Sequence, residues 1–370
     1  MKALRNLFDK MRPSFEDGGK LHMFRSVFDG FETFLFVSPT ASAQGTHIHD
    51  CMDSKRLMTF VIIALMPAML FGMYNVGYQH FTLINQEASF FEMFFFGFLA
   101  VLPKIVVSYA VGLGIEFTVA QWKKEEIQEG FLVSGMIIPM IIPVTTPLWM
   151  LALATAFSVI FAKEVFGGTG YNIFNVALIT RAFLFFSYPQ AMTGDSIWVA
   201  EADGLTAATP LATPAAFDLN NSITGLIPGC IGETSVIAIA IGAVILLFTG
   251  VASWKTMVSV FIGGAITACL FNCVGSTAAS QMPWYAHLCV GGFCFGAVFM
   301  ATDPVTSART ETGKWIYGFL IGVIAICVRV MGGYPEGMML AILAMNMFAP
   351  LIDYFVVDSN IKKRKNRTTK

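Results

Sequence analysis

The apolar run Phe131–Ile142 is closed by Pro143-Val144-Thr145-Thr146-Pro147, and this stretch constrains the architecture of the whole chain. A helix needs about 20 apolar residues to cross a bilayer, so the run is too short to cross as one straight helix. A half-helix followed by irregular backbone is tolerated at membrane depth only inside protein or beside a water-filled cavity. The stretch therefore predicts a broken helix within a bundle of membrane helices.

The same short pattern occurs in both halves of the chain. Ile142-Pro143-Val144-Thr145-Thr146 is matched by Asp303-Pro304-Val305-Thr306-Ser307, and Phe166-Gly167-Gly168 is matched by Met331-Gly332-Gly333. Each match alone is weak, but both occur in the same order, after the third and the fourth apolar run of each half. Because a unit with an odd number of spans enters from the opposite face in its second copy, the pattern predicts an inverted repeat. We expect the functional groups where the broken third and eighth spans meet.

The composition indicates an integral membrane protein. Of the 370 residues, 56% are hydrophobic and 13% are charged, and the mean hydropathy is +0.68. A soluble domain has roughly 25% charged residues. The alternating pattern of an outer-membrane barrel is absent, and no basic patch suggests nucleic acid. We predict an all-α polytopic membrane protein with about ten transmembrane helices, arranged as two inverted five-helix repeats with broken helices.

The predicted spans follow the apolar runs. They are Leu57–Tyr74, Met93–Ala120, Phe131–Ile142, Leu148–Ala162, Ile173–Ser187, Val236–Thr249, Thr256–Val274, Trp284–Ala301, Trp315–Met331 and Met338–Val357, with a loop over Asn75–Glu92. The corresponding domains are an N-terminal cytoplasmic or interfacial segment (1–55), the first repeat (56–188), an outward loop (189–235), the second repeat (236–357) and a basic cytoplasmic tail (358–370).

The distribution of Lys and Arg predicts the orientation. With ten crossings, these residues fall on one side of the membrane, in the N-terminal segment, at Lys123 and Lys124, Lys163, Lys255, Arg309 and Lys314, and in the tail. An excess of Lys and Arg marks cytoplasmic loops. We therefore expect both termini in the cytoplasm and the loop 189–235 on the outer face.

The loop Pro228–Ser235 leads directly into the apolar run Val236–Thr249. Thr234 and Ser235 stand where a helix N-cap belongs, and the free N–H groups and dipole of a helix start favour phosphate. Two glycines let a bulky group approach the backbone. The loop therefore predicts either a phosphate-bearing site or, on its own merits, a simple cap at Thr234.

Nothing in the sequence predicts a structural metal. The seven cysteines include no CxxC pair, which argues against an iron–sulfur cluster held by this chain alone. His47, His49 and Asp50 are interpreted as polar loop residues, because no second ligand cluster accompanies them.

With these features in place, the chain resembles the family formed by the B subunits of Na⁺-translocating NADH:quinone reductases, over nearly its whole length. The motifs that carry the resemblance are Glu129-Gly130-Phe131-Leu132-Val133, Ala162-Lys163-Glu164-Val165-Phe166-Gly167-Gly168-Thr169-Gly170, Arg181-Ala182-Phe183-Leu184-Phe185-Phe186, Gly232-Glu233-Thr234-Ser235 and Ala301-Thr302-Asp303-Pro304-Val305-Thr306-Ser307. The related D subunit of the Rnf complex typically has Ser-Gly-Ala-Thr at the attachment loop, where this chain has Ile231-Gly232-Glu233-Thr234.

The resemblance implies a redox function in a bacterial inner membrane. FMN is expected on Thr234 through a phosphoester that a flavin transferase adds, with Gly232, Glu233 and Ser235 around it, and a non-covalent riboflavin nearer the cytoplasm. Electrons would come from the NADH-oxidising subunit and the FMN-bearing C subunit of a six-subunit complex and reduce quinone, coupled to Na⁺ export. The D subunit of an Rnf-type ferredoxin:NAD oxidoreductase and a non-redox channel or transporter are the alternatives.

Charged residues within the membrane provide further candidates, because they are costly there and should face the interior. Arg181 would neutralise the flavin phosphate, stabilise reduced flavin or pair with carbonyls, and for Arg329 pairing with carbonyls or snorkelling is favoured. Hard cations prefer oxygen ligands, so candidate Na⁺ ligands, which could equally be helix-end residues, are Glu116, Glu164, Asp303 and Glu336. Candidates for the edge of a quinone pocket, or for a simple helix entry, are Glu129, Gly130 and Phe131.

Overall fold

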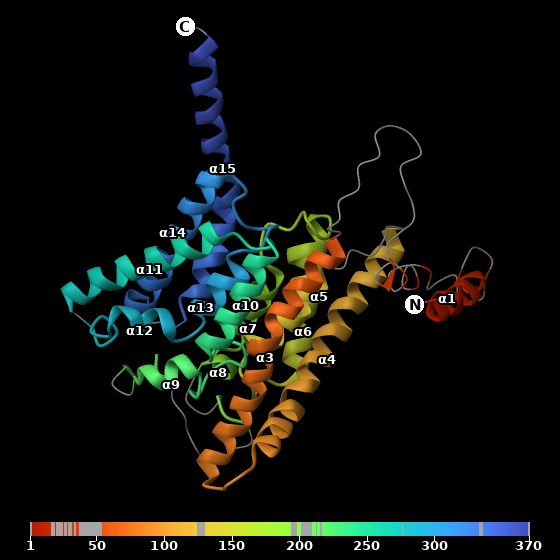
Figure 1. Ribbon diagram of the computed structural model, residues 1–370, viewed down its shortest axis with the longest axis horizontal. Coiled ribbons are helices and arrows are strands. Elements are labelled where there is room, and N and C mark those ends of the chain that lie inside the picture. Colours follow the sequence, from red (N-terminus) through yellow and green to blue (C-terminus); the bar gives the residue numbers. More distant parts are fainter. Residues whose placement is uncertain are drawn as a thin grey trace.

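The computed structural model shows a bundle of helices, with α1 (Lys2–Phe15) to one side (Figure 1). It describes residues 2–15, 54–123, 130–193, 198–200, 209–211, 213–214, 217–275, 277–332 and 336–368, with positions 19, 25, 28, 32, 35 and 36. Every regular element in these ranges is a helix. Six are long and apolar enough to cross a membrane, and three shorter apolar helices lie among them. The all-α polytopic class is confirmed.

The first two spans form a long antiparallel pair, α3 (Ser54–Ile84) and α4 (Phe90–Lys123). The predicted loop Asn75–Glu92 is wrong over most of its length, because α3 continues to Ile84. The polar residues that suggested a loop have partners within the protein. Asn75 donates from Nδ2 to the carbonyl of Ile227 at 2.9 Å, and the His80 ring stacks on Phe96 with centroids 4.1 Å apart.

The predicted half-helix is confirmed as α5 (Phe131–Met140). Its carbonyls find partners on α4: Ser108 donates to Gly135 at 3.0 Å and Tyr109 donates to Leu132 at 2.6 Å. These bonds satisfy backbone groups that lipid cannot satisfy.

The rest of the first half returns along the bundle. Helix α6 (Leu148–Ser158) continues through a π-helical turn, η2 (Val159–Lys163), and a short 3₁₀ turn, η3 (Glu164–Phe166). Helix α7 (Val176–Ser187) begins at the Asn175 cap, whose side chain accepts from the backbone N–H groups of Ala177 and Leu178. The short helices α8 (Pro189–Met192) and α9 (Leu219–Thr224) follow in the loop between the halves.

The second half contains α10 (Val236–Phe248), α11 (Trp254–Val274), α14 (Glu311–Met331) and α15 (Met338–Thr368). The predicted eighth span is broken into α12 (Trp284–Cys289), α13 (Phe293–Phe295) and a second π-helical turn, η5 (Gly296–Met300). The break falls at Gly291, whose φ of +69° favours glycine.

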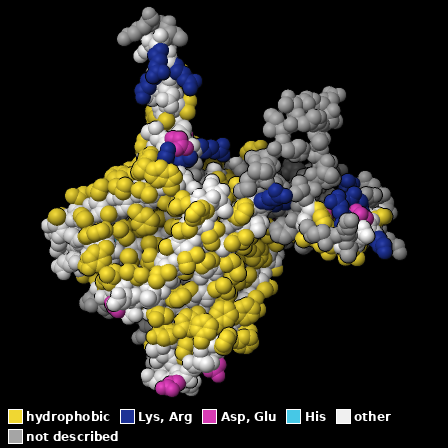
Figure 2. Space-filling model, viewed as in Figure 1, with side chains coloured by type: hydrophobic (Ala, Val, Ile, Leu, Met, Phe, Trp, Pro, Cys, Tyr) yellow, Lys and Arg dark blue, Asp and Glu magenta, His cyan; other side chains and the backbone are white. Residues whose placement is uncertain are grey.

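Side chains are segregated along the bundle. Figure 2 shows an apolar flank, with Lys and Arg and some Asp and Glu near the end from which α15 projects, and Asp and Glu without Lys or Arg at the opposite end. We call these the basic end and the acidic end. The predicted basic tail is helical through Thr368, as the last turns of α15. The location of the termini in the cytoplasm stays a prediction.

Candidate functional site

The loop Pro228–Ser235 lies where the two broken spans meet. The Gly232 N–H donates to the Met140 carbonyl at the end of α5 at 2.8 Å, and the Cys230 thiol donates to the Ile141 carbonyl at 3.3 Å. A Cβ on Gly232 would lie 3.0 Å from the ring of Phe295, in the second broken span. The loop therefore satisfies the free carbonyls of one half-helix while it packs on the other.

A buried charged cluster holds this junction together. Arg181 of α7 donates from Nη1 to Glu233 Oε1 at 2.5 Å and from Nη2 to Glu336 Oε2. Glu336 Oε1 accepts from the Gly292 N–H at 3.0 Å. We call these four residues the Arg181 cluster. Since they come from α7, the loop, the broken span and the segment just before α15, the cluster ties four distant parts of the chain together.

Arg181 therefore pairs with two carboxylates, Glu233 and Glu336, which the sequence singled out for other roles. Burying a charge is costly unless it is paired and hydrogen-bonded, and here both partners are supplied by the protein. Arg329 behaves as favoured from the sequence. It donates to the carbonyls of His287 at 2.6 Å and Val290 at 3.3 Å, and so caps the end of α12.

Ser235, not Thr234, caps the following helix. The Ser235 Oγ accepts from the Ala238 N–H at 3.3 Å, so the interpretation of Thr234 as a simple cap is wrong. The Thr234 side chain is 2% exposed, and among the described residues its hydroxyl has no hydrogen-bond partner. A buried hydroxyl without a partner costs about 1–3 kcal/mol. Thr234 shares this feature with the hydroxyls of Thr146, Thr155 and Thr169 among the described residues.

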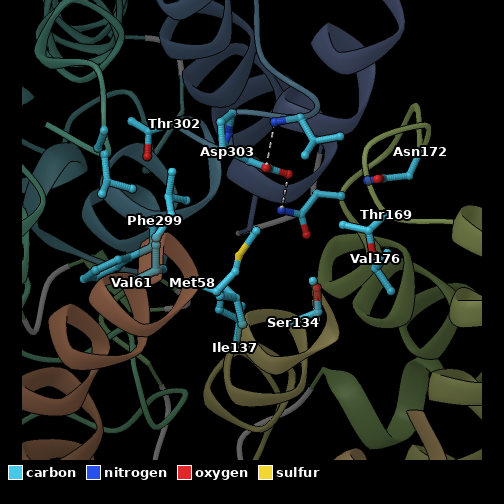
Figure 3. Close-up of a pocket in the computed structure, with 18 of the residues that line it drawn as sticks. Met58, Val61, Ser134, Ile137, Thr169, Asn172, Val176, Phe299, Thr302 and Asp303 are labelled. Atoms are coloured by element: carbon cyan, nitrogen blue, oxygen red, sulfur yellow. Dashed lines mark hydrogen bonds between the residues drawn. The ribbon is translucent and has the colours of Figure 1, made fainter. Parts of the chain in front are cut away.

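A second polar region lies at the basic end, as a cavity of about 80 Å³ between the two halves (Figure 3). Its lining includes the start of α3, α5, the start of α7 and the segment after η5. Val61 and Phe299 form an apolar wall, and Ser134, Thr169 and Asn172 lie across from them. A pocket for an organic ligand has roughly 300–1,000 Å³. The cavity has room for several water molecules or a partly hydrated ion but not for a flavin.

Asp303 faces this basic-end cavity. Its Oδ2 accepts from Thr306 Oγ1 at 2.9 Å and from Asn175 Nδ2 at 3.3 Å, and its Oδ1 accepts from the Val305 N–H at 3.1 Å. Figure 3 shows Met58 extending toward Asp303 across the opening. The carboxylate is therefore held by neutral donors from both halves, and none of the ion pairs among the described residues involves it.

The other three Na⁺ candidates lie elsewhere. Glu116 pairs with Lys163, Glu164 lies 3.7 Å from the Lys123 amine, and Glu336 belongs to the Arg181 cluster. Within the described ranges, no three His, Cys, Asp or Glu side chains are grouped to hold a metal ion, and His47, His49 and Asp50 lie outside those ranges. The structure therefore brings Asp303 alone of the four to the basic-end cavity.

The three quinone candidates do not form one surface. Gly130 lines the basic-end cavity, whereas Phe131 is 1% exposed and packs its ring against Gly112 of α4. Glu129 lies outside the described residues. Lys163 was missed as a site residue, because the sequence places it at a span end. It is buried, and it lines the cavity together with Asp303.

Comparison with known proteins identifies the family of this chain. The family model described as "NQR2, RnfD, RnfE family" matches residues 41–362. The chain is 43% identical to the B subunit of the Na(+)-translocating NADH-quinone reductase of Chromohalobacter salexigens, with 99% of this chain and 97% of the relative covered. It is 42% identical to the proteins of the same name from Neisseria meningitidis serogroup A and Klebsiella pneumoniae, with 99% of this chain and 99% and 100% of those relatives covered.

Proposed function

The chain belongs to the NQR2, RnfD, RnfE family, and from this premise we propose that it is the membrane-spanning B subunit of a Na⁺-translocating NADH:quinone reductase. Identity of 42–43% across nearly the full length of relatives with that name supports the enzyme over the Rnf and channel alternatives. Its partners would be the NADH-oxidising subunit, the FMN-bearing C subunit and the lipid of a bacterial inner membrane. Its substrates would be quinone and Na⁺.

We propose that the loop 189–235 carries a phosphoester-linked FMN, with Thr234 as the acceptor. When bound, the flavin would supply one-electron transfer. The residues present fit this role in one respect: the Thr234 hydroxyl lacks a partner among the described residues, and an ester oxygen needs none. Arg181 pairs with Glu233 beside it, which reduces the repulsion that this carboxylate would exert on a phosphate. Ser235 fixes the start of α10, so the N–H groups of its first turn face the loop.

The burial of Thr234 limits when a flavin transferase could modify it. At 2% exposure the side chain cannot meet a transferase in the described conformation, so the loop must be modified before it packs or must open. Other hydroxyls of the same segment are more accessible, because Thr209 is half-buried and Thr213 is exposed. The experiment must therefore identify the residue as well as the adduct.

The test is in-gel flavin fluorescence and peptide mass mapping of the protein coexpressed with its flavin transferase. Thr234→Ala should abolish the fluorescent band, and Ser235→Ala, its matched neighbour, should retain it. An adduct on Thr209 or Thr213 would reassign the acceptor and keep the redox function. Complete absence of covalent flavin in the wild-type complex would overturn the proposed flavin relay.

We propose that riboflavin and Na⁺ both bind near the basic end. The basic-end cavity is too small for riboflavin, so we propose that this flavin binds at an interface with a neighbouring subunit, near the cytoplasm. Asp303 is proposed to meet Na⁺ inside the cavity, since it offers a carboxylate among neutral donors. Quinone would approach the same end near Gly130.

A further inference from the structure

Lys163 and Glu116 form an ion pair inside the bundle. The Lys163 amine, at the last position of η2, donates to Glu116 Oε1 on α4, and both side chains are 4% exposed. Glu116 Oε2 has no hydrogen-bond partner among the described residues. At the nearby bundle edge, the Glu164 carboxylate lies 3.7 Å from Lys123. Glu116 is therefore the carboxylate that neutralises the buried amine.

Lys163 also belongs to the basic-end cavity. Of the described residues that line it, Lys163 is the one base and Asp303 the one acid, and Glu116 is not part of the lining. A π-helical turn from each half contributes to the wall, η2 through Lys163 and η5 through Phe299. π-Helical turns are rare in proteins overall but are found frequently at functional sites, because they change where one side chain points.

The charge of Lys163 bears directly on any cation in the cavity. Charges interact more strongly inside a protein than in bulk water, because the effective dielectric constant is lower there. An amine without a counter-charge would repel a cation and attract the Asp303 carboxylate. With Glu116 bound to the amine, the pair is neutral, and Asp303 remains as the uncompensated charge of the lining.

We propose that the Glu116–Lys163 pair sets the Na⁺ affinity of the basic-end cavity by neutralising the one amine among the described residues of its wall. Both are positioning residues, because neither touches the ion in this scheme. The inference rests on the proposed function, in which Na⁺ meets Asp303. It assigns Glu116 a role through Lys163 rather than as a Na⁺ ligand.

The test measures the Na⁺ concentration for half-maximal NADH:quinone reductase activity in the purified complex, with ionic strength held constant by choline chloride. Glu116→Gln leaves the Lys163 charge unpaired, so the half-saturating Na⁺ concentration should rise roughly fivefold. Lys163→Gln leaves the Glu116 charge unpaired, so the half-saturating Na⁺ concentration should fall by a similar factor. The double variant should return close to the wild-type value.

Lys163→Arg is the conservative control, because it keeps the charge and should keep the wild-type Na⁺ dependence. Complex yield and activity at saturating Na⁺ monitor folding separately. A merely structural pair would lower yield in both single variants and shift Na⁺ affinity in neither, which would overturn the inference. Shifts in the same direction would overturn it as well.

Different outcomes of these measurements would refute the proposed function. If the wild-type complex shows no Na⁺ stimulation, or if Asp303→Asn leaves the Na⁺ dependence unchanged, then Na⁺ does not meet Asp303 and the proposed function is wrong at this site. If Asp303→Asn shifts the Na⁺ dependence and the Glu116 and Lys163 variants do not shift it in opposite directions, only the role of the pair is refuted.

Discussion

The junction around the Arg181 cluster and the basic-end cavity use charge in opposite ways. At the junction, Arg181 is hydrogen-bonded to two carboxylates, and the loop, α7, the broken span and α15 are tied into one unit. At the basic end, Asp303 is held by a hydroxyl, an amide and a backbone N–H and faces open volume. A saturated ion cluster fixes a conformation, whereas a carboxylate held by neutral donors keeps its charge for a mobile cation.

The largest effect is expected from a substitution that breaks the junction around the Arg181 cluster. Arg181→Gln leaves Glu233 and Glu336 without their cation, and removal of one partner from a buried ion pair costs about 3–5 kcal/mol. We expect poor assembly and a sharply lowered melting temperature in detergent. Intrinsic tryptophan fluorescence during thermal unfolding measures this. A wild-type melting curve would show that the cluster does not hold the loop in place.

A second change separates the loop from α3. A Cβ on Gly72 would lie 1.9 Å from the Ile231 carbonyl oxygen, so Gly72→Ala must displace the loop or the helix. Overpacking of this kind costs about 1–3 kcal/mol. Gly114→Ala on α4 is the matched control, because no atom lies within 4 Å of its added Cβ. Limited proteolysis of the segment 189–235 should accelerate in the first variant and not in the second.

A third change acts on the basic end alone. Asp303→Asn keeps the size of the side chain and removes its charge, so the Na⁺ concentration for half-maximal activity should rise about tenfold. Activity at saturating Na⁺ and the melting temperature should change far less than in Arg181→Gln. Equal losses of stability in the two variants would remove the distinction between the two regions.

The smallest expected effect concerns the cap beside the proposed attachment residue. Ser235→Ala removes the acceptor for the Ala238 N–H and should cost about 1 kcal/mol. Covalent flavin should be retained. A loss of flavin in this variant comparable to that in Thr234→Ala would indicate that helix order at α10, rather than the Thr234 hydroxyl, controls attachment.

Much of the fold was predictable, because bilayer thickness and hydrophobicity act on local sequence. The half-helix α5 was identified from its apolar length and the turn that follows it. The recurring turn also predicted that the eighth span is broken, but the break at Gly291 lies inside the predicted span Trp284–Ala301 and was not located. The error at Asn75–Glu92 has a physical cause. Asn75 and His80 look like loop residues until the Ile227 carbonyl and the Phe96 ring are placed beside them.

The candidate site was predictable only in part, because pairing between distant residues leaves no local pattern. Arg181, Glu233 and Glu336 were each singled out, but for separate roles, and the structure joins them in one cluster. Lys163 was missed because a Lys at a span end usually reaches water. The π-helical turn η2 is a backbone feature that no residue type predicts.

The sequence by itself determined the membrane class, the short third span and the recurrence of its turn in the second half, because each depends on the free energy of placing local stretches in lipid. Only the tertiary structure decided which charges neutralise each other and that Asp303 faces a cavity. Those outcomes depend on contacts between residues far apart in the chain, whose geometry packing alone fixes.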